Sequence, residues 1–128
     1  MAKLLLIEAD ALQAASAVKL LQKAGHSVDW QVDPQEALDR ADEHLPELII
    51  MDIMLAGHSG VEFLYEFRSY PDWHQIPVVI FCSLSAEELK EALSGFEHLK
   101  LEAYHYKPST TLAELAATVE RTLRPVSA

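Results

Sequence analysis

Short apolar runs alternate along this chain with longer amphipathic segments, and that alternation limits the fold more than any other feature of the sequence. The three most apolar runs are too short for helices and rich in branched side chains, and they span residues 4–7, 48–51 and 78–81. Strands that are buried on both faces read in this way, because helices cover both faces of a parallel sheet. The alternation therefore predicts an α/β fold.

Two weaker segments complete the predicted sheet. Residues 28–32 alternate apolar and polar side chains, which is typical of a half-exposed edge strand, and residues 104–106 precede the pair Lys107-Pro108. Five strand–helix units in strict alternation predict a doubly wound parallel sheet with five helices, right-handed crossovers and the strand order 2-1-3-4-5. We expect one domain over residues 1–128, with a core of about 3–123.

The helix ends carry clear signals. The first helix is expected at about residues 11–24, and Gly25 after it is the preferred residue for a left-handed C-terminal cap. Asp33 is followed by a proline at the first helical position and by Glu36, the spacing of a capping box. The same spacing marks three further helix starts, at Ser59, Ser85 and Thr111.

Charge and composition limit the partners of the chain. The net charge of −10 argues against direct nucleic-acid binding, because duplex binding depends on Lys and Arg side chains that neutralise phosphates. The single cysteine excludes an internal disulfide and a cysteine-rich zinc site. No apolar run approaches a signal peptide or the roughly 20 residues of a membrane span. We therefore expect a cytoplasmic protein that binds other proteins and does not associate with a membrane.

The ligand site of such a sheet lies beyond the carboxyl ends of the strands, near the switch in strand order. The residues at these ends are acids, small residues and one lysine: Glu8, Ala9, Asp10, Asp52, Cys82, Ser83 and Lys107. Acids beside a lysine indicate cation and phosphate chemistry. The histidines show no ligand spacing, and Trp30 and Trp73 are expected to be packing residues.

With these residues in place, the sequence resembles the receiver domains of bacterial response regulators, which have a flavodoxin-like fold. Residues 46–60 are similar to the strand that ends in the family's phosphoacceptor aspartate, here Asp52, and to the loop that closes on a glycine. Residues 76–81 match the strand that leads to the family's switch hydroxyl, and Lys107-Pro108 matches its Lys-Pro pair. These segments occur in the family's order and at its spacing.

The resemblance implies a mechanism. Asp52 would accept a phosphoryl group from a phosphohistidine on a histidine kinase or a phosphotransfer protein, forming an acyl phosphate. Lys107 would neutralise the phosphoryl oxygens, and Mg²⁺ would be held by acids after the first strand, by Asp52 and by the backbone carbonyl of Met54. Such a domain is a regulatory module of two-component phosphorelay signalling and not an enzyme. Tyr104 occupies the family's aromatic switch position.

Ala9 departs from the family at the metal site. It stands where the family places a direct metal ligand, and a methyl group has no electron pair to donate. Glu8 can still hold an ion through a water, whereas Asp10 needs a rearranged backbone to substitute for the missing ligand. We therefore expect a degenerate receiver with weakened Mg²⁺ binding, whose acidic pocket consists of Glu8, Asp10, Asp52 and the carbonyl of Met54.

The switch position departs as well. Cys82 stands where the family has Thr or Ser, and a thiol is a weaker hydrogen-bond donor than a hydroxyl. Ser83 follows, but its side chain should start in a different direction. The signalling surface expected from the resemblance includes the fourth helix, the fifth strand and the fifth helix, a face through which a homodimer could also form.

Three functions stay open. The favoured interpretation is a degenerate receiver that acts through regulated protein–protein interaction, with a kinase or phosphotransfer protein, a downstream signalling protein, or both. A fully active Mg²⁺-dependent receiver is the alternative, and it would need Glu8 or Asp10 to replace the missing ligand. An aspartate-nucleophile phosphatase is disfavoured, because that class has a second Asp two residues after the nucleophile, where this chain has Met54.

Overall fold

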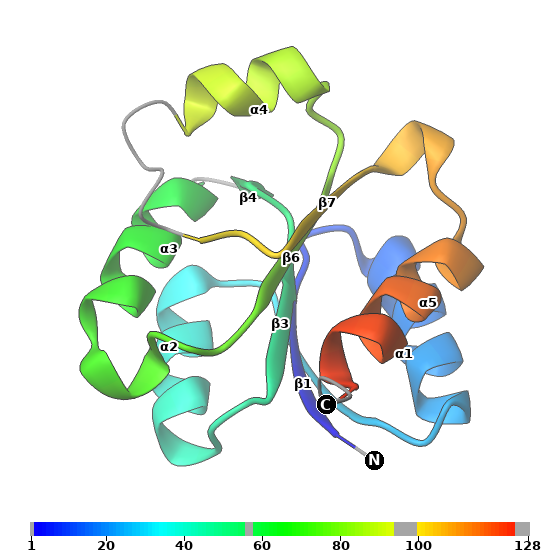
Figure 1. The fold of residues 1–128 in the computed structure, drawn as a ribbon, viewed down its shortest axis with the longest axis horizontal. Helices are drawn as coiled ribbons and strands as arrows, with labels where there is room; N and C mark the ends of the chain where they lie inside the picture. The colour runs from blue at the N-terminus through cyan, green and yellow to red at the C-terminus, as the bar shows by residue number, and fades with distance from the viewer. Residues whose placement is uncertain (1, 56–57, 94–99, 125–128) are drawn as a thin grey trace.

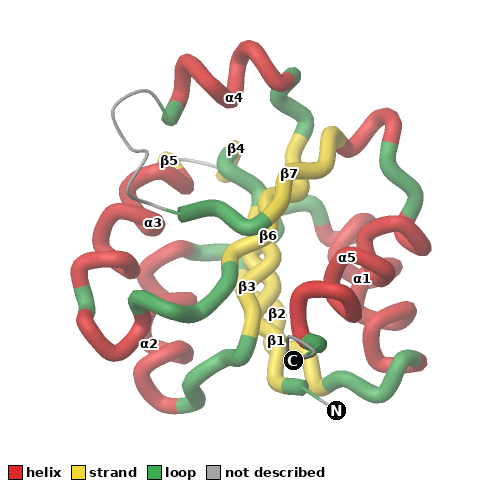
Figure 2. The backbone as a smooth tube through the Cα atoms, in the orientation of Figure 1, coloured by secondary structure: helices red, strands yellow, loops and turns green. Residues whose placement is uncertain are grey.

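The computed structural model describes residues 2–55, 58–93 and 100–124. The elements in chain order are β1 (Lys3–Ile7), α1 (Ala11–Lys23), β2 (Ser27–Gln31), α2 (Pro34–Glu43), β3 (Leu48–Met51), β4 (Met54–Leu55), β5 (His58–Ser59), α3 (Gly60–Ser69), η1 (Pro71–Trp73), β6 (Val78–Cys82), α4 (Ala86–Ala92), β7 (Ala103–Tyr106), η3 (Lys107–Ser109) and α5 (Leu112–Leu123). Five parallel strands form the main sheet in the order β2-β1-β3-β6-β7. Figure 2 shows the strands of this sheet, in yellow, at the centre of the molecule. Since β6 and β7 are its fourth and fifth strands along the chain, the predicted order 2-1-3-4-5 is confirmed.

Helices cover both faces of this sheet. Figure 1 shows the sheet edge-on, with α2 and α3 on one side and α1 and α5 on the other. Strands β1, β3 and β6 are buried, and their side chains alternate between two apolar clusters: Leu5 and Ile49 belong to the cluster under α2 and α3, and Leu4 and Leu6 to the cluster under α1 and α5. The continuous apolar runs of the sequence are thus the strands covered from both sides. No helix in the described ranges is long and apolar enough to cross a membrane.

The structure agrees with the helix ends predicted at Gly25, Asp33, Ser85 and Thr111, while the cap at Ser59 stays a prediction. Gly25 follows α1 with a φ of 97°, a left-handed conformation that glycine adopts without steric cost. Asp33 accepts a hydrogen bond from the N–H of Glu36 at the start of α2. Both hydrogen bonds of a capping box are present at Ser85 and at Thr111.

The sequence did not predict the small antiparallel pair of β4 and β5, in which Met54 pairs with Ser59 and Leu55 with His58. Strands of two residues are too short to show a period of hydrophobicity, so the pattern that predicted the main sheet has no power here. The hairpin lies between Asp52 and α3, and residues 56–57 within it lie outside the described part of the chain.

Candidate functional site

Three charged side chains meet where strands of the main sheet end. Glu8 follows β1, Asp52 follows β3 and Lys107 follows β7. The ammonium nitrogen of Lys107 lies 2.6 Å from Oδ2 of Asp52 and 2.7 Å from Oε1 of Glu8. The carboxyl ends of parallel strands share one edge of a sheet, which is why residues 44 and 99 positions apart in the chain come together. We call Glu8, Asp52 and Lys107 the ion triad.

The ion triad is buried. The side chains of Glu8, Asp52 and Lys107 are 4%, 7% and 7% exposed. Burial alone lowers the pKa of Lys107, but the hydrogen bonds and charges of Asp52 and Glu8 outweigh it, so that the pKa is raised from its ordinary value. The ammonium also lies 5.5 Å from the centre of the Phe81 ring. Lys107 is therefore held in its charged form between two carboxylates.

Backbone contacts fix Asp52 in this position. Its N–H donates to the carbonyl of Ile7, at 3.0 Å, and its Oδ1 accepts the N–H of Met54, at 2.8 Å. The loop after Asp52 closes on Gly60, whose N–H donates to the carbonyl of Ile53 at 2.9 Å. A Cβ at Gly60 would lie only 2.8 Å from Cα of Ile53, which explains why the loop needs a glycine there.

The structure brings Glu8 into the triad but directs Asp10 elsewhere. Oε2 of Glu8 accepts the N–H of Asp10, at 3.1 Å. The carboxylate of Asp10 is exposed, and its Oδ1 accepts the N–H groups of Leu12 and Gln13 as the N-cap of α1. An aspartate directly before a helix is the sequence signal for such a cap, so this role of Asp10 could have been predicted in place of a metal ligand.

Ala9, between these two acids, is half-buried and packs against the apolar cluster that contains Ile7, Met51 and Ile53. Its methyl group therefore extends the core where the resemblance predicts a carboxylate. With Ala9 apolar and Asp10 used as a cap, the ion triad holds two negative charges and one positive charge. Its formal net charge is −1.

The donor set offers two carboxylates to a Mg²⁺ ion, the cofactor that the resemblance implies. Mg²⁺ takes octahedral oxygen coordination and usually keeps several waters beside one or two protein carboxylates, so Glu8 and Asp52 could hold it. Both carboxylates already lie against the ammonium of Lys107, and a bound cation would compete with that charge for them. Within the described ranges, no group of three or more His, Cys, Asp and Glu side chains is placed to hold a metal ion. The Met54 carbonyl stays a predicted ligand.

The switch residues lie around this site. Cys82 ends β6 and is fully buried, and burial raises the pKa of its thiol, with a further contribution from the charge of Asp52. Ser83 is exposed. The hydroxyl of Tyr104, on β7, donates to the carbonyl of Leu84 in the loop after β6. Tyr104 thereby connects the edge strand to the loop that leads into α4.

One contact at the site was not predicted. Trp30, on β2, donates from its indole Nε1 to the carbonyl of Glu8, at 2.8 Å. The alternating pattern of β2 placed Trp30 on one face of the sheet, but no pattern in a sequence shows which carbonyl an indole reaches. A second long-range contact joins His26 to Glu120 at 2.5 Å, far from the triad, where His26 is a buried structural residue.

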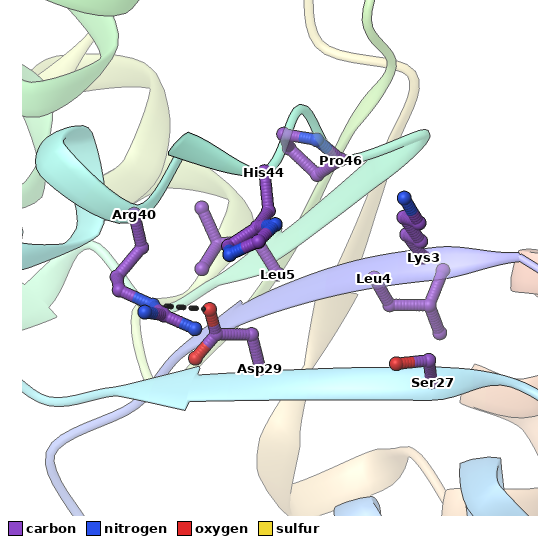
Figure 3. A pocket seen from close by; sticks show the side chains of 8 residues that line it. All are labelled: Lys3, Leu4, Leu5, Ser27, Asp29, Arg40, His44 and Pro46. Atoms are coloured by element: carbon purple, nitrogen blue, oxygen red, sulfur yellow. Dashed lines mark hydrogen bonds and ion pairs between the residues drawn. The ribbon is translucent and has the colours of Figure 1, made fainter. Parts of the chain in front are cut away.

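A hollow of about 250 Å³ lies at the opposite, amino end of the sheet (Figure 3). Lys3 and Ser27 are the first residues of β1 and β2, and the hollow contains none of the predicted site residues. It is lined by Lys3, Leu4, Leu5, Ser27, Asp29, Arg40, His44 and Pro46. In its lining, Arg40 forms an ion pair with Asp29 at 2.8 Å.

Comparisons with known proteins agree on one family. The family model described as the response regulator receiver domain matches residues 4–119. The phosphate regulon transcriptional regulatory protein PhoB of Rhizobium meliloti (strain 1021) is 34% identical over 104 residues, which are 81% of this chain and 44% of that protein. The chain thus spans less than half the length of this curated relative.

Solved structures show the same fold. A putative response regulator from Chloroflexus aurantiacus J-10-fl superposes with a TM-score of 0.82 at 27% identity, covering 94% of this chain and 95% of that one. The receiver domain of sensor histidine kinase PA1611 from Pseudomonas aeruginosa PAO1, which has a magnesium ion coordinated in its active site cleft, superposes with a TM-score of 0.81 at 21% identity. That likeness covers 94% of this chain and 95% of that one and concerns the fold alone.

Proposed function

Since the chain belongs to the family of response regulator receiver domains, we propose that it is a receiver with Asp52 at the phosphoacceptor position and a pocket neutralised by Lys107 in place of a tightly held metal ion. Receiver domains take part in two-component signalling, where they interact with histidine kinases or phosphotransfer proteins and are generally regulatory. They generally bind Mg²⁺ in the active site. We propose that this chain departs from that pattern in the way its pocket is neutralised.

The ion triad is the observation that carries the proposal. Phosphoryl transfer to a carboxylate requires positive charge beside the acceptor, because the incoming group is itself negative. Lys107, 2.6 Å from Asp52, can supply one such charge. Ala9 removes a carboxylate from the pocket, so the triad attracts a divalent cation less strongly than a pocket with three acids would. Mg²⁺ is therefore expected to bind weakly.

The same geometry supports the roles that we propose for the other residues. Asp52 is the nucleophile, and the N–H of Met54 holds its Oδ1 while Oδ2 faces Lys107. Glu8 shares the ammonium with Asp52 and so orients Lys107. The thiol of Cys82 is a poor donor for a phosphoryl oxygen, which favours control through binding of a partner over a strong phosphorylation switch.

The proposed partners are a histidine kinase or phosphotransfer protein, a downstream signalling protein, or both. The proposal also includes a homodimer through the face of α4, β7 and α5, and no direct binding of nucleic acid by this chain. The acidic surface supports the last point, because direct binding would bring a chain of net charge −10 against phosphates.

A phosphorylation assay with acetyl phosphate, read by intact mass, tests the proposal. The chain is incubated with and without Mg²⁺ beside Asp52→Asn as the acceptor control and Ala9→Asp as the restored pocket. We expect slow labelling of the parent that Mg²⁺ hardly accelerates, no labelling of Asp52→Asn, and labelling of Ala9→Asp that depends on Mg²⁺.

Three results would contradict the proposal. Rapid Mg²⁺-dependent labelling of the parent would establish the fully active receiver instead. Labelling that persists in Asp52→Asn would remove Asp52 from the acceptor position. Steady release of phosphate by the parent from a phosphomonoester, abolished in Asp52→Asn, would establish the phosphatase alternative.

A further inference from the structure

We propose that Trp30 is a positioning residue of the ion triad: its indole N–H holds the carbonyl of Glu8 and thereby sets where the Glu8 carboxylate lies relative to Lys107. The inference deepens the proposed function, since Glu8 orients the lysine beside Asp52. Trp30 is not itself a member of the triad. Its role is exerted through one backbone carbonyl.

Glu8 is held from β2 although β1 has already ended. The last pair in the register of β1 and β2 is Ile7 with Gln31. One residue further on, the N–H of Glu8 still donates to the carbonyl of Gln31, at 3.1 Å, and the carbonyl of Glu8 accepts the indole N–H of Trp30, at 2.8 Å. Both backbone groups of Glu8 are thus fixed by β2, one through the backbone and the other through a side chain.

The indole determines the path of the chain after Glu8. Holding a carbonyl fixes the plane of the peptide that joins Glu8 to Ala9, and this plane directs the following turn. In that turn the N–H of Asp10 reaches Oε2 of Glu8, at 3.1 Å, while the carboxylate of Asp10 caps α1. The second oxygen of Glu8 is left to meet Lys107, at 2.7 Å. The arrangement keeps Glu8 in the triad and Asp10 out of it.

Tryptophan suits this position because it combines a large apolar body with one donor. Trp30 is half-buried and packs against the cluster that contains Leu4 and Leu6, on the face of α1 and α5. Its N–H extends from that cluster to the strand end. A phenylalanine would keep most of the packing and lose the donor, so the two contributions can be separated by experiment.

Backbone amide NMR of the whole chain tests the inference through the N–H of Asp10, which reports the position of the Glu8 carboxylate. The variants are Trp30→Phe, Glu8→Gln as the reference for a weakened acceptor, and Trp73→Phe as a matched control, since Trp73 is buried in η1 against Phe67. We expect Trp30→Phe to move the Asp10 amide signal toward its position in Glu8→Gln. Trp73→Phe should leave that signal in place.

An isosteric replacement distinguishes the hydrogen bond from packing. In the Trp73→Phe background, Trp30 is replaced biosynthetically by benzothienylalanine, which has sulfur in place of the indole N–H and nearly the same shape. Movement of the Asp10 signal in this protein supports the inference, and this arm decides alone if Trp30→Phe fails to fold. An unmoved signal overturns it, including the case in which only Trp30→Phe moves the signal, because packing would then be the role of Trp30. None of these readings depends on whether Asp52 accepts a phosphoryl group.

Discussion

The two ends of the sheet hold ion pairs of nearly the same length in opposite surroundings. At the carboxyl end, Lys107 lies 2.6 Å from Asp52, and both side chains are 7% exposed. In the hollow of Figure 3, which lies toward the amino end, Arg40 is 2.8 Å from Asp29, the middle residue of β2, and the side chains are 42% and 30% exposed. The two pairs are therefore almost equal in length and differ in the burial of their side chains.

The two ion pairs differ in whether water can solvate a charge whose partner has been removed. Water can solvate Asp29 if Arg40 is removed, so an exposed pair of this kind adds little to stability. Water reaches Glu8 and Asp52 poorly, so removal of Lys107 would leave two neighbouring charges without compensation. The buried end is therefore a site whose charge must balance internally, whereas the open end tolerates changes of charge.

The largest predicted effect is that of Lys107→Met. Breaking a buried ion pair by removing one partner costs about 3–5 kcal/mol, because an uncompensated charge is left behind. Urea denaturation at pH 7 should show a loss of this order in the free energy of unfolding. Lys19→Met, an exposed change on α1, is the matched control and should be nearly neutral. A cost equal to that of the control would show that the triad is not a balanced unit.

A smaller effect is predicted in alkaline solution. The pKa of Lys107 is raised by Asp52 and Glu8 in the folded state, so folding binds the proton more tightly. The stabilisation is complete below the ordinary lysine value of 10.5 and is lost as the pH rises through the higher folded pKa. Burial also raises the pKa of Cys82 and Tyr104, which adds an alkaline loss of the same sign.

Because these other groups also lower stability at high pH, the effect of Lys107 is measured as a difference between the parent and Lys107→Met. Melting temperatures from pH 8 upward should fall more steeply for the parent than for Lys107→Met, because only the parent has the lysine proton to lose. Arg40→Gln should follow the parent, since Asp29 raises the pKa of Arg40 further above that of a lysine, so that Arg40 keeps its charge where Lys107 loses its proton. Parallel curves for the parent and Lys107→Met would show that the triad does not hold this proton.

The smallest predicted effect is that of Arg40→Gln itself. The loss in the free energy of unfolding should be far smaller than for Lys107→Met and should disappear at about 1 M salt, where the screening length is only about 3 Å. Paired urea titrations at low and high salt measure it. A large loss that salt does not reduce would mean that the open end of the sheet is as tightly coupled as the buried one.

The fold was predictable because its signals are local and repeated. The strands near Ile7, Met51 and Phe81 are continuous apolar runs, and Gly25 is a standard helix end. That Glu8, Asp52 and Lys107 share one edge follows from the parallel sheet alone. Their roles stay predictions until they are tested.

The contacts that set the details of the site were not predictable. The bond from Trp30 to Glu8 spans 22 residues and that from His26 to Glu120 spans 94, and both depend on side-chain directions that no period encodes. The position of Asp10 was not predicted for a different reason. Two roles compete for one carboxylate, and the cap of α1 takes it because the N–H groups of Leu12 and Gln13 lie within reach.

The central claim is that Ala9 leaves the pocket to be neutralised by Lys107. Thermal melts across Mg²⁺ concentrations test it most directly, with the parent, Ala9→Asp and Ala9→Asp combined with Asp52→Asn. A third carboxylate should make the Mg²⁺-free variant less stable than the parent. Bound Mg²⁺ should then raise the melting temperature of the variant, because a hundredfold excess over Kd adds about 2.7 kcal/mol of stability. Asp52→Asn should remove most of that gain, and the parent should hardly respond. A parent that gained as much from Mg²⁺ as Ala9→Asp, or an Ala9→Asp variant that gained nothing, would contradict the claim.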